Sequence, residues 1–268
     1  MKSSDWHNKV CLVTGASAGL GLAIAKAFSQ RGAKVVITAR RAEPLQQAAE
    51  KLAANVEPIA ADVTCQEDVE RLRDAVAERF GQLDLLCNCA GQSTRGKVLD
   101  TTVEEFQQLL DVNFLAAVRT TGCFAPLLLE RKGHVVNVSS LAGKVAPRFM
   151  GGYPASKFAL AAYSQQLRLE LGPKGLHVLL VCPGPILRED PTPRYADGSS
   201  DLPAAAQQPA AGAKLRGLDP DWLAERIVAA CERRQPELVV PWKVRLLLAV
   251  SQLSPQLGDW LLLRSTGG

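Results

Sequence analysis

The chain reads KVCLVTGASAGLG from Lys9 to Gly21, and this stretch decides the fold. A short apolar run passes directly into a glycine-rich turn and then into an amphipathic stretch, which predicts a strand, a tight turn and a helix. Glycines let the backbone turn sharply and bring N–H groups at the positive end of a helix close to a pyrophosphate. The glycines at positions 15, 19 and 21 are not spaced as in the common dinucleotide fingerprint, so a plain tight turn is the alternative interpretation. The residues that we expect to contact the phosphates are Gly15, Ser17, Ala18, Gly19, Leu20 and Gly21.

The strand-then-helix pattern continues along most of the chain. Apolar runs that predict strands lie at residues 9–13, 34–38, 56–60, 83–87, 133–138 and 176–182, and stretches that predict helices lie at 20–30, 42–54, 67–80, 103–130 and 152–171. The strands are apolar on both faces, as expected for strands that are covered by helices on two sides. We therefore predict an α/β fold, a Rossmann-like doubly wound parallel sheet of about seven strands in a three-layer α/β/α arrangement. Residues 1–268 are expected to form a single domain that binds its ligands at the carboxyl ends of the strands.

The pattern changes after the sixth predicted strand. Residues 188–217 are rich in Pro, Ala, Gly and Gln without a sustained period, and we interpret them as a loop that forms a lid over the substrate. A helix at 220–233 and a short strand at 238–240 are expected to follow. The last stretch, 242–264, is an apolar extension that Pro255 divides into two short helices. We expect it to pack on its own chain or at a subunit interface, and peripheral contact with a membrane that delivers lipid-like substrates is the alternative.

Composition and charge argue against several classes of protein. Apolar residues make up 47% of the 268 residues and charged residues 22%, as in ordinary globular proteins. The net charge of +4 is small and dispersed, which argues against a nucleic-acid partner. The seven cysteines show no zinc-finger spacing, so we expect no metal site and reduced thiols in the cytoplasm. Residues 1–9 are polar and predict neither a secretory signal nor a membrane span.

The end of the second predicted strand indicates which dinucleotide the fold prefers. An acidic residue at this position normally binds the ribose 2′-hydroxyl of NAD. Here Ala39 stands at this position, and Arg40 and Arg41 follow it. A guanidinium group suits the 2′-phosphate of NADP, which it binds through charge-assisted and often bidentate hydrogen bonds. The sequence therefore predicts NADP(H) as the cofactor, and a pair of solvated arginines is the alternative interpretation.

Tyr153 and Lys157 lie four residues apart and therefore on one face of a predicted helix. A phenol is a weak base at neutral pH, but a nearby ammonium group favours the phenolate. Tyr153 would then donate a proton to a carbonyl oxygen or accept one from an alcohol. Ser140 ends the fifth predicted strand, where its hydroxyl would donate a hydrogen bond to the oxygen on which negative charge develops.

With these residues the sequence resembles the short-chain dehydrogenase/reductase family, and the resemblance extends from about residue 9 to residue 186. The family's glycine motif matches residues 14–21, and its Asn-Asn-Ala-Gly motif matches residues 88–91. The catalytic residues that the resemblance implies are Asn113, Ser140, Tyr153 and Lys157. Of these, Asn113 would anchor a water molecule in a proton relay, and Lys157 would also bind the nicotinamide ribose. The cofactor contacts that it implies, besides Tyr153 and Lys157, are Asp62 and Val63 near the adenine, Asn88, Ala90, Gly91, Pro183, Gly184, and Ile186 near the carboxamide.

Two positions depart from the family pattern. Cys89 replaces the second Asn of the Asn-Asn-Ala-Gly motif, at a position thought to be mainly structural. Arg188 replaces a Thr that is common on the loop touching the carboxamide or diphosphate. The second change leaves the geometry of that loop open, although an arginine could itself contact a phosphate.

The resemblance implies an oxidoreductase that interconverts a ketone or aldehyde and an alcohol by hydride transfer, acts on an apolar or lipid-like small molecule, and forms a homodimer or homotetramer. One alternative is a 3-oxoacyl-carrier-protein reductase, because Arg131 and Arg168 lie roughly where those enzymes place basic residues for an acidic carrier protein. The apolar C-terminal extension argues against it. An alternative from another class is a non-catalytic NADP(H)-sensing or scaffold protein, although such proteins usually lose the Tyr or Lys that is present here.

Overall fold

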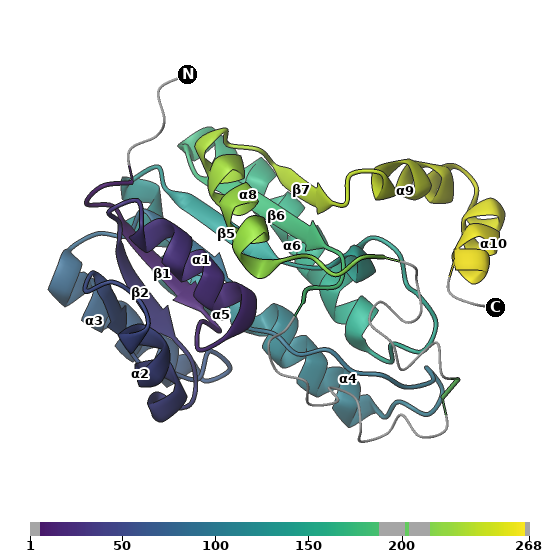
Figure 1. The fold of residues 1–268 in the computed structure, drawn as a ribbon, viewed down its shortest axis with the longest axis horizontal. Helices are drawn as coiled ribbons and strands as arrows, with labels where there is room; N and C mark the ends of the chain where they lie inside the picture. Colours follow the sequence, from purple (N-terminus) through teal and green to yellow (C-terminus); the bar gives the residue numbers. More distant parts are fainter. Residues whose placement is uncertain (1–5, 188–201, 204–214, 266–268) are drawn as a thin grey trace.

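The structure, a computed structural model, describes residues 6–187, 202–203 and 215–265 and contains one sheet of seven parallel strands (Figure 1). The strands lie in the order β3-β2-β1-β4-β5-β6-β7, so the sheet is built outward from β1 in both directions. This confirms the predicted doubly wound sheet and places the switch point, where such folds bind their ligands, between β1 and β4. The strands are β1 (Val10–Thr14), β2 (Lys34–Thr38), β3 (Val56–Pro58), β4 (Leu85–Asn88), β5 (His134–Val138), β6 (His177–Pro183) and β7 (Glu237–Val240).

Helices cover both faces of the sheet. One face packs against α1 (Gly19–Ser29), α2 (Ala42–Glu50) and α8 (Pro220–Glu232), and the other against α3 (Gln66–Phe80), α5 (Ala116–Glu130) and α6 (Tyr153–Leu171). Alternate residues of β1 show how the strands serve both layers, because Cys11 and Val13 lie in the first core and Val10 and Leu12 in the second. All four side chains are buried, which explains why the strands are apolar without alternation.

The long apolar stretch at 103–130 is interrupted. It forms α4 (Val103–Leu110), one π-helical turn (Asp111–Leu115) and α5. A capping box at Thr102 and Glu105 starts α4, since each side chain accepts a hydrogen bond from the other residue's backbone N–H. The whole stretch is long and apolar enough to cross a membrane by length and composition. However, α5 buries Phe124 and Leu128 against the sheet, so packing within the fold accounts for its apolar character.

The C-terminal extension forms two short helices, α9 (Val244–Leu253) and α10 (Pro255–Ser265), with Pro255 at the start of the second as the sequence indicates. Both project from the end of the body beyond β7 (Figure 1). Only α9 reaches a core cluster, through Val244 and Leu248, which pack beside Leu180 and Val239. The large apolar side chains that remain exposed on the extension are Trp242, Leu246, Leu253, Leu257, Trp260 and Leu263. Within the part of the chain that the structure describes, these six side chains therefore remain at least 44% exposed.

His134 and His177 begin neighbouring strands and pair with each other. Their Nδ1 atoms lie 2.8 Å apart, and Nε2 of His177 lies 2.8 Å from the carbonyl oxygen of Gln235. Because a carbonyl oxygen only accepts, Nε2 of His177 carries a proton, and its Nδ1 accepts the hydrogen bond that Nδ1 of His134 donates. Burial lowers the pKa of His134 to about 3 and that of His177 to about 4. Both imidazoles are therefore neutral at physiological pH.

This pair is expected to make the fold sensitive to acid. Unfolded histidines bind a proton below about pH 6.5, whereas the folded pair stays neutral down to about pH 3–4, so stability falls as the pH drops through this window. Between about pH 7.5 and 5.5 the free energy of unfolding should fall by on the order of 1–3 kcal/mol because of the pair. Urea unfolding at both values measures it. In the His134→Phe/His177→Leu variant the free energy of unfolding should fall less between these two pH values. The control His7→Gln, which changes the third histidine, should show the same fall as the wild type. An unchanged fall in the double variant would contradict this account.

Candidate active site

The glycine-rich turn lies at the carboxyl end of β1, next to the loop that follows β4. Gly15 has φ +65°, and a Cβ there would lie 2.7 Å from the Cα of Ala90, so only glycine fits. Ala18 is the N-cap of α1 and provides no side-chain hydrogen bond to the first turn of the helix. The first N–H groups of α1 therefore have no side-chain cap. Such an open helix N-terminus suits an anion such as a pyrophosphate.

Thr14 ties this turn to the loop after β4. Its Oγ1 accepts hydrogen bonds from the backbone N–H groups of Cys89 and Ala90, each at 3.1 Å. The sequence motif at residues 14–21 included Thr14 without assigning it a role. The feature of the sequence that could have indicated a role for Thr14 is its position immediately before the first glycine of the turn. The two loops that flank the switch point are thus fixed relative to each other.

Lys157 lies on the buried side of α6, one turn after Tyr153. Its Nζ donates a hydrogen bond of 3.0 Å to the carbonyl oxygen of Val138, at the end of β5, and lies 5.9 Å from the centre of the Tyr153 ring. The side chain is almost completely buried. A Cβ at Gly91 would lie 3.4 Å from this Nζ, so the glycine keeps space open beside the ammonium group. The structure thus places the ammonium group and the phenol ring side by side at the carboxyl edge of the sheet.

Asn113 lies in the π-helical turn between α4 and α5, a feature that is frequent at functional sites. Its Nδ2 donates to the carbonyl oxygen of Gln92 (2.8 Å) and to Oγ of Ser156 (3.0 Å), and its Oδ1 accepts from the N–H of Gln92 (2.8 Å). Ser156 in turn donates to the carbonyl oxygen of Tyr153. Asn113 therefore anchors the first turn of the helix that carries Tyr153 and Lys157. Sequence reasoning did not identify Ser156 as part of this chain of hydrogen bonds.

Two serines follow β5 and serve different functions. Ser140 is partly exposed, and its Oγ accepts a hydrogen bond of 3.1 Å from the N–H of Ala142. This bond leaves its hydroxyl hydrogen available to donate elsewhere. Ser139 is buried and donates to the carbonyl oxygen of Lys157 at 3.1 Å, so it holds α6 against the end of the strand.

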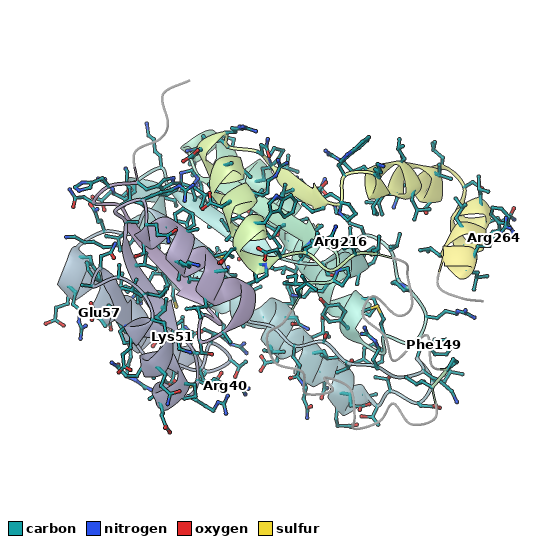
Figure 2. The ribbon with its side chains drawn as sticks, in the orientation of Figure 1. Arg40, Lys51, Glu57, Phe149, Arg216 and Arg264 are labelled. Atoms are coloured by element: carbon teal, nitrogen blue, oxygen red, sulfur yellow. The ribbon has the colours of Figure 1, made fainter. Side chains whose placement is uncertain are left out.

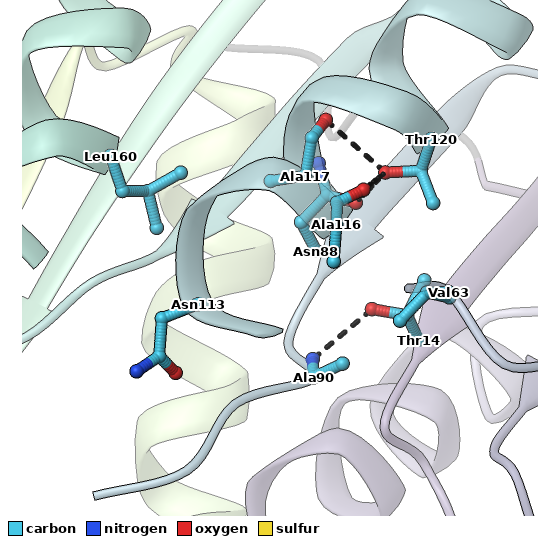
Figure 3. A pocket seen from close by; sticks show the side chains of 9 residues that line it. All are labelled: Thr14, Val63, Asn88, Ala90, Asn113, Ala116, Ala117, Thr120 and Leu160. Carbon is cyan, nitrogen blue, oxygen red and sulfur yellow. Dashed lines mark hydrogen bonds between the residues drawn. The ribbon is translucent and has the colours of Figure 1, made fainter. Parts of the chain in front are cut away.

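A network of buried amides and hydroxyls supports the floor of the site, and Figure 3 shows two of its members, Asn88 and Thr120. Asn88 donates to Oδ1 of Asn137 (2.9 Å) and to Oγ1 of Thr121 (3.2 Å), and it accepts from Oγ1 of Thr120 (2.7 Å). A cavity of about 10 Å³ lies beside this network, and Asn88, Thr120, Thr14, Asn113 and Leu160 are among the residues that line it (Figure 3). The side chain of Asn88 thus joins β4, β5 and α5, and its expected contact with the cofactor remains a prediction.

Cys89, the departure from the family motif, does not introduce a reactive thiol. Burial raises its pKa to about 12, and the nearby ammonium group of Lys157 offsets this only partly. The thiol is therefore protonated at neutral pH and behaves as a small packing residue. Its backbone N–H still binds Thr14, so the geometry of the loop does not depend on the replaced side chain.

Arg40 and Arg41 follow the end of β2 and are both exposed. Figure 2 shows Arg40 at the margin of the molecule beside α2. Within the described part of the chain neither guanidinium group forms an ion pair with a carboxylate. The carboxylate of Asp62, on the neighbouring loop, accepts from the N–H and the Oγ1 of Thr64 at 2.9 and 2.7 Å. The two arginines therefore form an open cationic edge beside the switch point.

Comparison with known proteins identifies the family. A family model described as short chain dehydrogenase matches residues 9–193. The chain is 31% identical over 263 residues to dehydrogenase/reductase SDR family protein 7-like of Drosophila melanogaster, covering 95% of this chain and 79% of that protein. It is 36% identical over 177 residues to an uncharacterized oxidoreductase of Staphylococcus epidermidis, covering 66% of this chain and 77% of that protein. A solved short-chain dehydrogenase from Streptomyces avermitilis matches with a TM-score of 0.81, 32% identity and 97% coverage of both chains.

The chain belongs to the short-chain dehydrogenase/reductase family. It is therefore an oxidoreductase with a dinucleotide-binding fold, as the resemblance implied. The residues brought together at its carboxyl edge come from β1, β4, the π-helical turn, the end of β5 and α6. They lie up to 143 positions apart in the sequence, from Thr14 to Lys157 (157 − 14).

The expected cofactor contacts after β6 are placed only in part. Pro183 ends the strand, the N–H of Gly184 donates to the carbonyl oxygen of Val240 at 2.8 Å, and Ile186 forms a parallel bridge with Leu218. These contacts hold the residues that follow β6 in position, with Gly184 beside β7 and Ile186 beside Leu218. The expected lid at 188–217 and the departure at Arg188 lie outside the described residues, apart from 202–203 and 215–217.

The arginines that suggested a carrier-protein site in this oxidoreductase lie at the other edge of the sheet. Arg131 is bound through Nε to the carboxylate of Asp84, just before β4, at 3.3 Å. Arg168 donates to the carbonyl oxygen of Pro236, just before β7, at 3.4 Å. Both residues are thus directed to the amino-terminal edge, whereas Tyr153 lies at the carboxyl edge.

Proposed function

We propose that this oxidoreductase uses NADP(H) to interconvert a ketone or aldehyde and the corresponding alcohol. The observation that carries the proposal is the buried ammonium group of Lys157 beside the ring of Tyr153, at the edge of the sheet where such folds bind their ligands. A scaffold or sensor protein has no need to bury an ammonium group there, since burying a charge is costly. The alternative of a non-catalytic protein is therefore less favoured.

The residues at the carboxyl edge fit a dinucleotide. Gly15 leaves no room for a side chain, and the uncapped N–H groups of α1 would bind the pyrophosphate. Asp62 and Val63 would contact the adenine, and Arg40 and Arg41 would bind a 2′-phosphate. The remaining contacts proposed are Ser17, Ala18, Gly19, Leu20, Gly21, Asn88, Ala90, Gly91, Pro183, Gly184 and Ile186.

When bound, the nicotinamide supplies or accepts a hydride, and the side chains of the protein handle the proton. Tyr153 would donate its phenolic proton to the carbonyl oxygen during reduction and accept it back during alcohol oxidation. The positive charge of Lys157 favours the phenolate that Tyr153 becomes. The hydroxyl of Ser140, which already accepts from Ala142, would donate to the same substrate oxygen and stabilise its developing charge. Asn113 would keep the helix that carries Tyr153 and Lys157 in position.

The substrate is proposed to be apolar. Met150 and Ala142 are buried and pack beside Tyr153, so the wall next to the catalytic phenol is apolar. The test is the oxidation of NADPH by the purified protein with ketones and aldehydes of graded length and polarity. Turnover that rises with the length of an apolar chain is expected. Turnover confined to acyl-carrier-protein thioesters would favour the 3-oxoacyl-carrier-protein reductase instead, and the absence of turnover with every carbonyl compound would favour the scaffold.

The exposed extension is proposed to be the contact between copies of this chain, in a homodimer or homotetramer. The extension contains many Leu residues together with Trp and Arg, and Asp259 is its only acidic residue. Apolar character, Trp and Arg, with few acidic residues, are typical of subunit interfaces. Arg264 lies over the ring of Trp260 with its guanidinium carbon 4.7 Å from the ring centre (Figure 2 shows Arg264 at the end of α10).

The protein is proposed to be cytoplasmic. Its seven cysteines are free thiols, and the cytoplasm keeps thiols reduced.

Charged substitutions on the extension should dissociate the oligomer. Leu253 is 88% exposed and Trp260 is 49% exposed, so Leu253→Glu/Trp260→Glu changes mainly surface side chains, and the one contact that it removes within the chain is that of Trp260 with Arg264, among the described residues. We expect its mass by light scattering to fall to that of the monomer, because two carboxylates would be desolvated at the interface. Leu99→Glu, at another site with 94% exposure, is the control and should keep the mass of the parent. An unchanged mass combined with loss of liposome binding would show that the extension contacts membranes instead.

A further inference from the structure

A second pocket lies at the amino-terminal edge of the sheet, on the opposite side from the candidate active site. Its volume is about 250 Å³. Four basic side chains and one carboxylate line it: Lys9, Arg131, Lys132, Arg234 and Asp84. They come from the residues that precede β1, β4 and β5 and from the end of α8. We refer to this site as the basic pocket.

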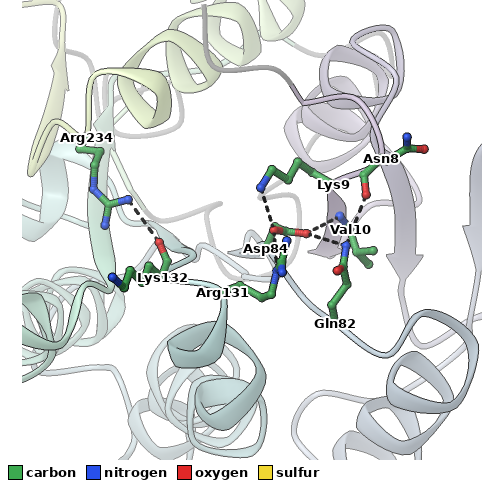
Figure 4. A network of polar contacts seen from close by, with 8 residues as sticks. All are labelled: Asn8, Lys9, Val10, Gln82, Asp84, Arg131, Lys132 and Arg234. Carbon is green, nitrogen blue, oxygen red and sulfur yellow. Dashed lines mark hydrogen bonds and ion pairs between the residues drawn. The ribbon is translucent and has the colours of Figure 1, made fainter.

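The single carboxylate is fully engaged (Figure 4). Asp84 accepts hydrogen bonds from the N–H of Val10 (2.9 Å), Nζ of Lys9 (3.2 Å), Nε of Arg131 (3.3 Å) and Nε2 of Gln82 (3.2 Å). It therefore compensates part of the charge of Lys9 and Arg131 and has no capacity left for other cations. With one acid against four bases, the lining of the basic pocket carries a net charge of +3 (4 − 1).

The other two cations face the pocket without a carboxylate. Among the residues that the structure describes, neither Lys132 nor Arg234 forms an ion pair. The guanidinium group of Arg234 donates to the carbonyl oxygen of Lys132 at 3.2 Å and to that of Gly175. Arg234 is exposed, and partial burial lowers the pKa of its guanidinium group. These contacts orient the guanidinium group but leave its charge uncompensated.

Both residues also adopt a backbone conformation that disfavours them. Lys132 has φ +47° and Arg234 has φ +48°, and each is the second residue after its helix, α5 or α8. Helices usually place glycine in this left-handed conformation, as this chain does with Gly81 after α3. A side chain in this conformation is unfavourable. The chain thus places cations at the two positions where helix termination favours glycine, and both line the same pocket.

Capping of the two helices does not require these side chains. The N–H of Lys132 donates to the carbonyl oxygen of Leu129 at 3.1 Å, and the N–H of Gly133 donates to that of Leu128 at 2.8 Å. In α8 the N–H groups of Arg234 and Gln235 make the equivalent bonds, both at 2.9 Å. Because backbone groups satisfy these terminal carbonyls, the helix ends do not depend on the side chains of Lys132 and Arg234.

We propose that the basic pocket binds a phosphate group, either free or carried by a small metabolite. A phosphate group carries a charge of about −1.5 to −2 at neutral pH and offers three acceptor oxygens. That charge matches the two uncompensated cations, and guanidinium and ammonium groups are the side chains that bind phosphate best. The volume exceeds that of a phosphate group alone and leaves space for a small organic part. This site is independent of the dinucleotide, which would bind at the opposite edge.

Amide chemical shifts measured during titration with inorganic phosphate, at constant ionic strength set by chloride, test the proposal. The N–H groups of Gly133 and Arg234 should shift with saturation. In Lys132→Gln/Arg234→Gln the Kd at Gly133 should rise by about tenfold or more, because two charge-assisted contacts are lost. In the control Lys174→Gln/Arg233→Gln, which removes two charges from neighbours that do not line the pocket, it should stay the same. Glycerol phosphate should bind as tightly as phosphate or tighter if the natural ligand has an organic part.

A second variant guards against a failure to fold. Lys132→Gly/Arg234→Gly places the residue that the left-handed conformation favours at both positions, so it should remain folded and lose the site. The proposal is overturned if Gly133 and Arg234 do not shift in the wild type, or if either double variant keeps the wild-type Kd. Shifts confined to Gly15 and Gly19 would also overturn it, since they would show phosphate binding only at the glycine-rich turn.

Discussion

Replacing Tyr153 with phenylalanine is expected to lower kcat by about 10²–10⁴-fold, the usual contribution of a general acid or base. The phenyl ring keeps the packing against Met150 and Ala142 but has no proton to give. The binding surface for the dinucleotide is otherwise unchanged, so the Kd of NADPH should remain close to that of the wild type. Steady-state turnover and fluorescence titration of NADPH measure the two quantities separately.

Tyr163→Phe is the matched control, because Tyr163 lies in the same helix, ten residues further on (163 − 153), and its ring packs against Phe114. Its turnover should stay close to that of the wild type. Lys157→Ala should weaken both binding and turnover, since Lys157 is assigned a contact with the ribose and an electrostatic effect on Tyr153. Wild-type turnover in Tyr153→Phe would overturn the proposed mechanism.

The order of the strands and helices could be predicted because every strand except the edge strand β3 is buried on both faces and each covering helix on one. The apolar runs at 34–38 and 133–138 coincide closely with β2 and β5. The helix at 42–54 was predicted too long, since α2 ends at Glu50. Boundaries of this kind depend on the local hydrogen bonds at the end of a helix, which periodicity does not encode.

The contacts between residues of the candidate site were harder to predict than the identity of those residues. The motifs pointed to Asn113 and Lys157, but not to the bonds through Ser156 and Gln92 that join the π-helical turn to α6. The pairing of His134 with His177 depends on the parallel register of β5 and β6 across 43 residues. A single sequence shows which residue types are present, whereas register and loop geometry decide which of them meet.

The choice of cofactor depends on the charge at the end of β2. There the structure leaves Arg40 and Arg41 exposed, without a carboxylate partner in the described residues, and the methyl side chain of Ala39 cannot form a hydrogen bond with a ribose hydroxyl. Hydrogen bonds to charged groups contribute about 1.5–3 kcal/mol, so NADPH should be preferred to NADH by roughly 10- to 150-fold in kcat/KM. The preference should decrease with ionic strength, because the two arginines are exposed to solvent.

Arg40→Ala/Arg41→Ala is therefore expected to remove most of this preference through a loss of kcat/KM for NADPH alone. The value for NADH should stay nearly constant, since NADH has no 2′-phosphate for the arginines to bind. Lys34→Ala/Lys51→Ala removes the same number of charges from exposed positions near the other ends of β2 and α2, and it should leave the ratio unchanged. A wild-type preference for NADH, or an unchanged ratio in the arginine variant, would show that the two arginines are only a solvated edge. An equal loss for both cofactors would instead place them at the pyrophosphate, because that group is common to NADH and NADPH.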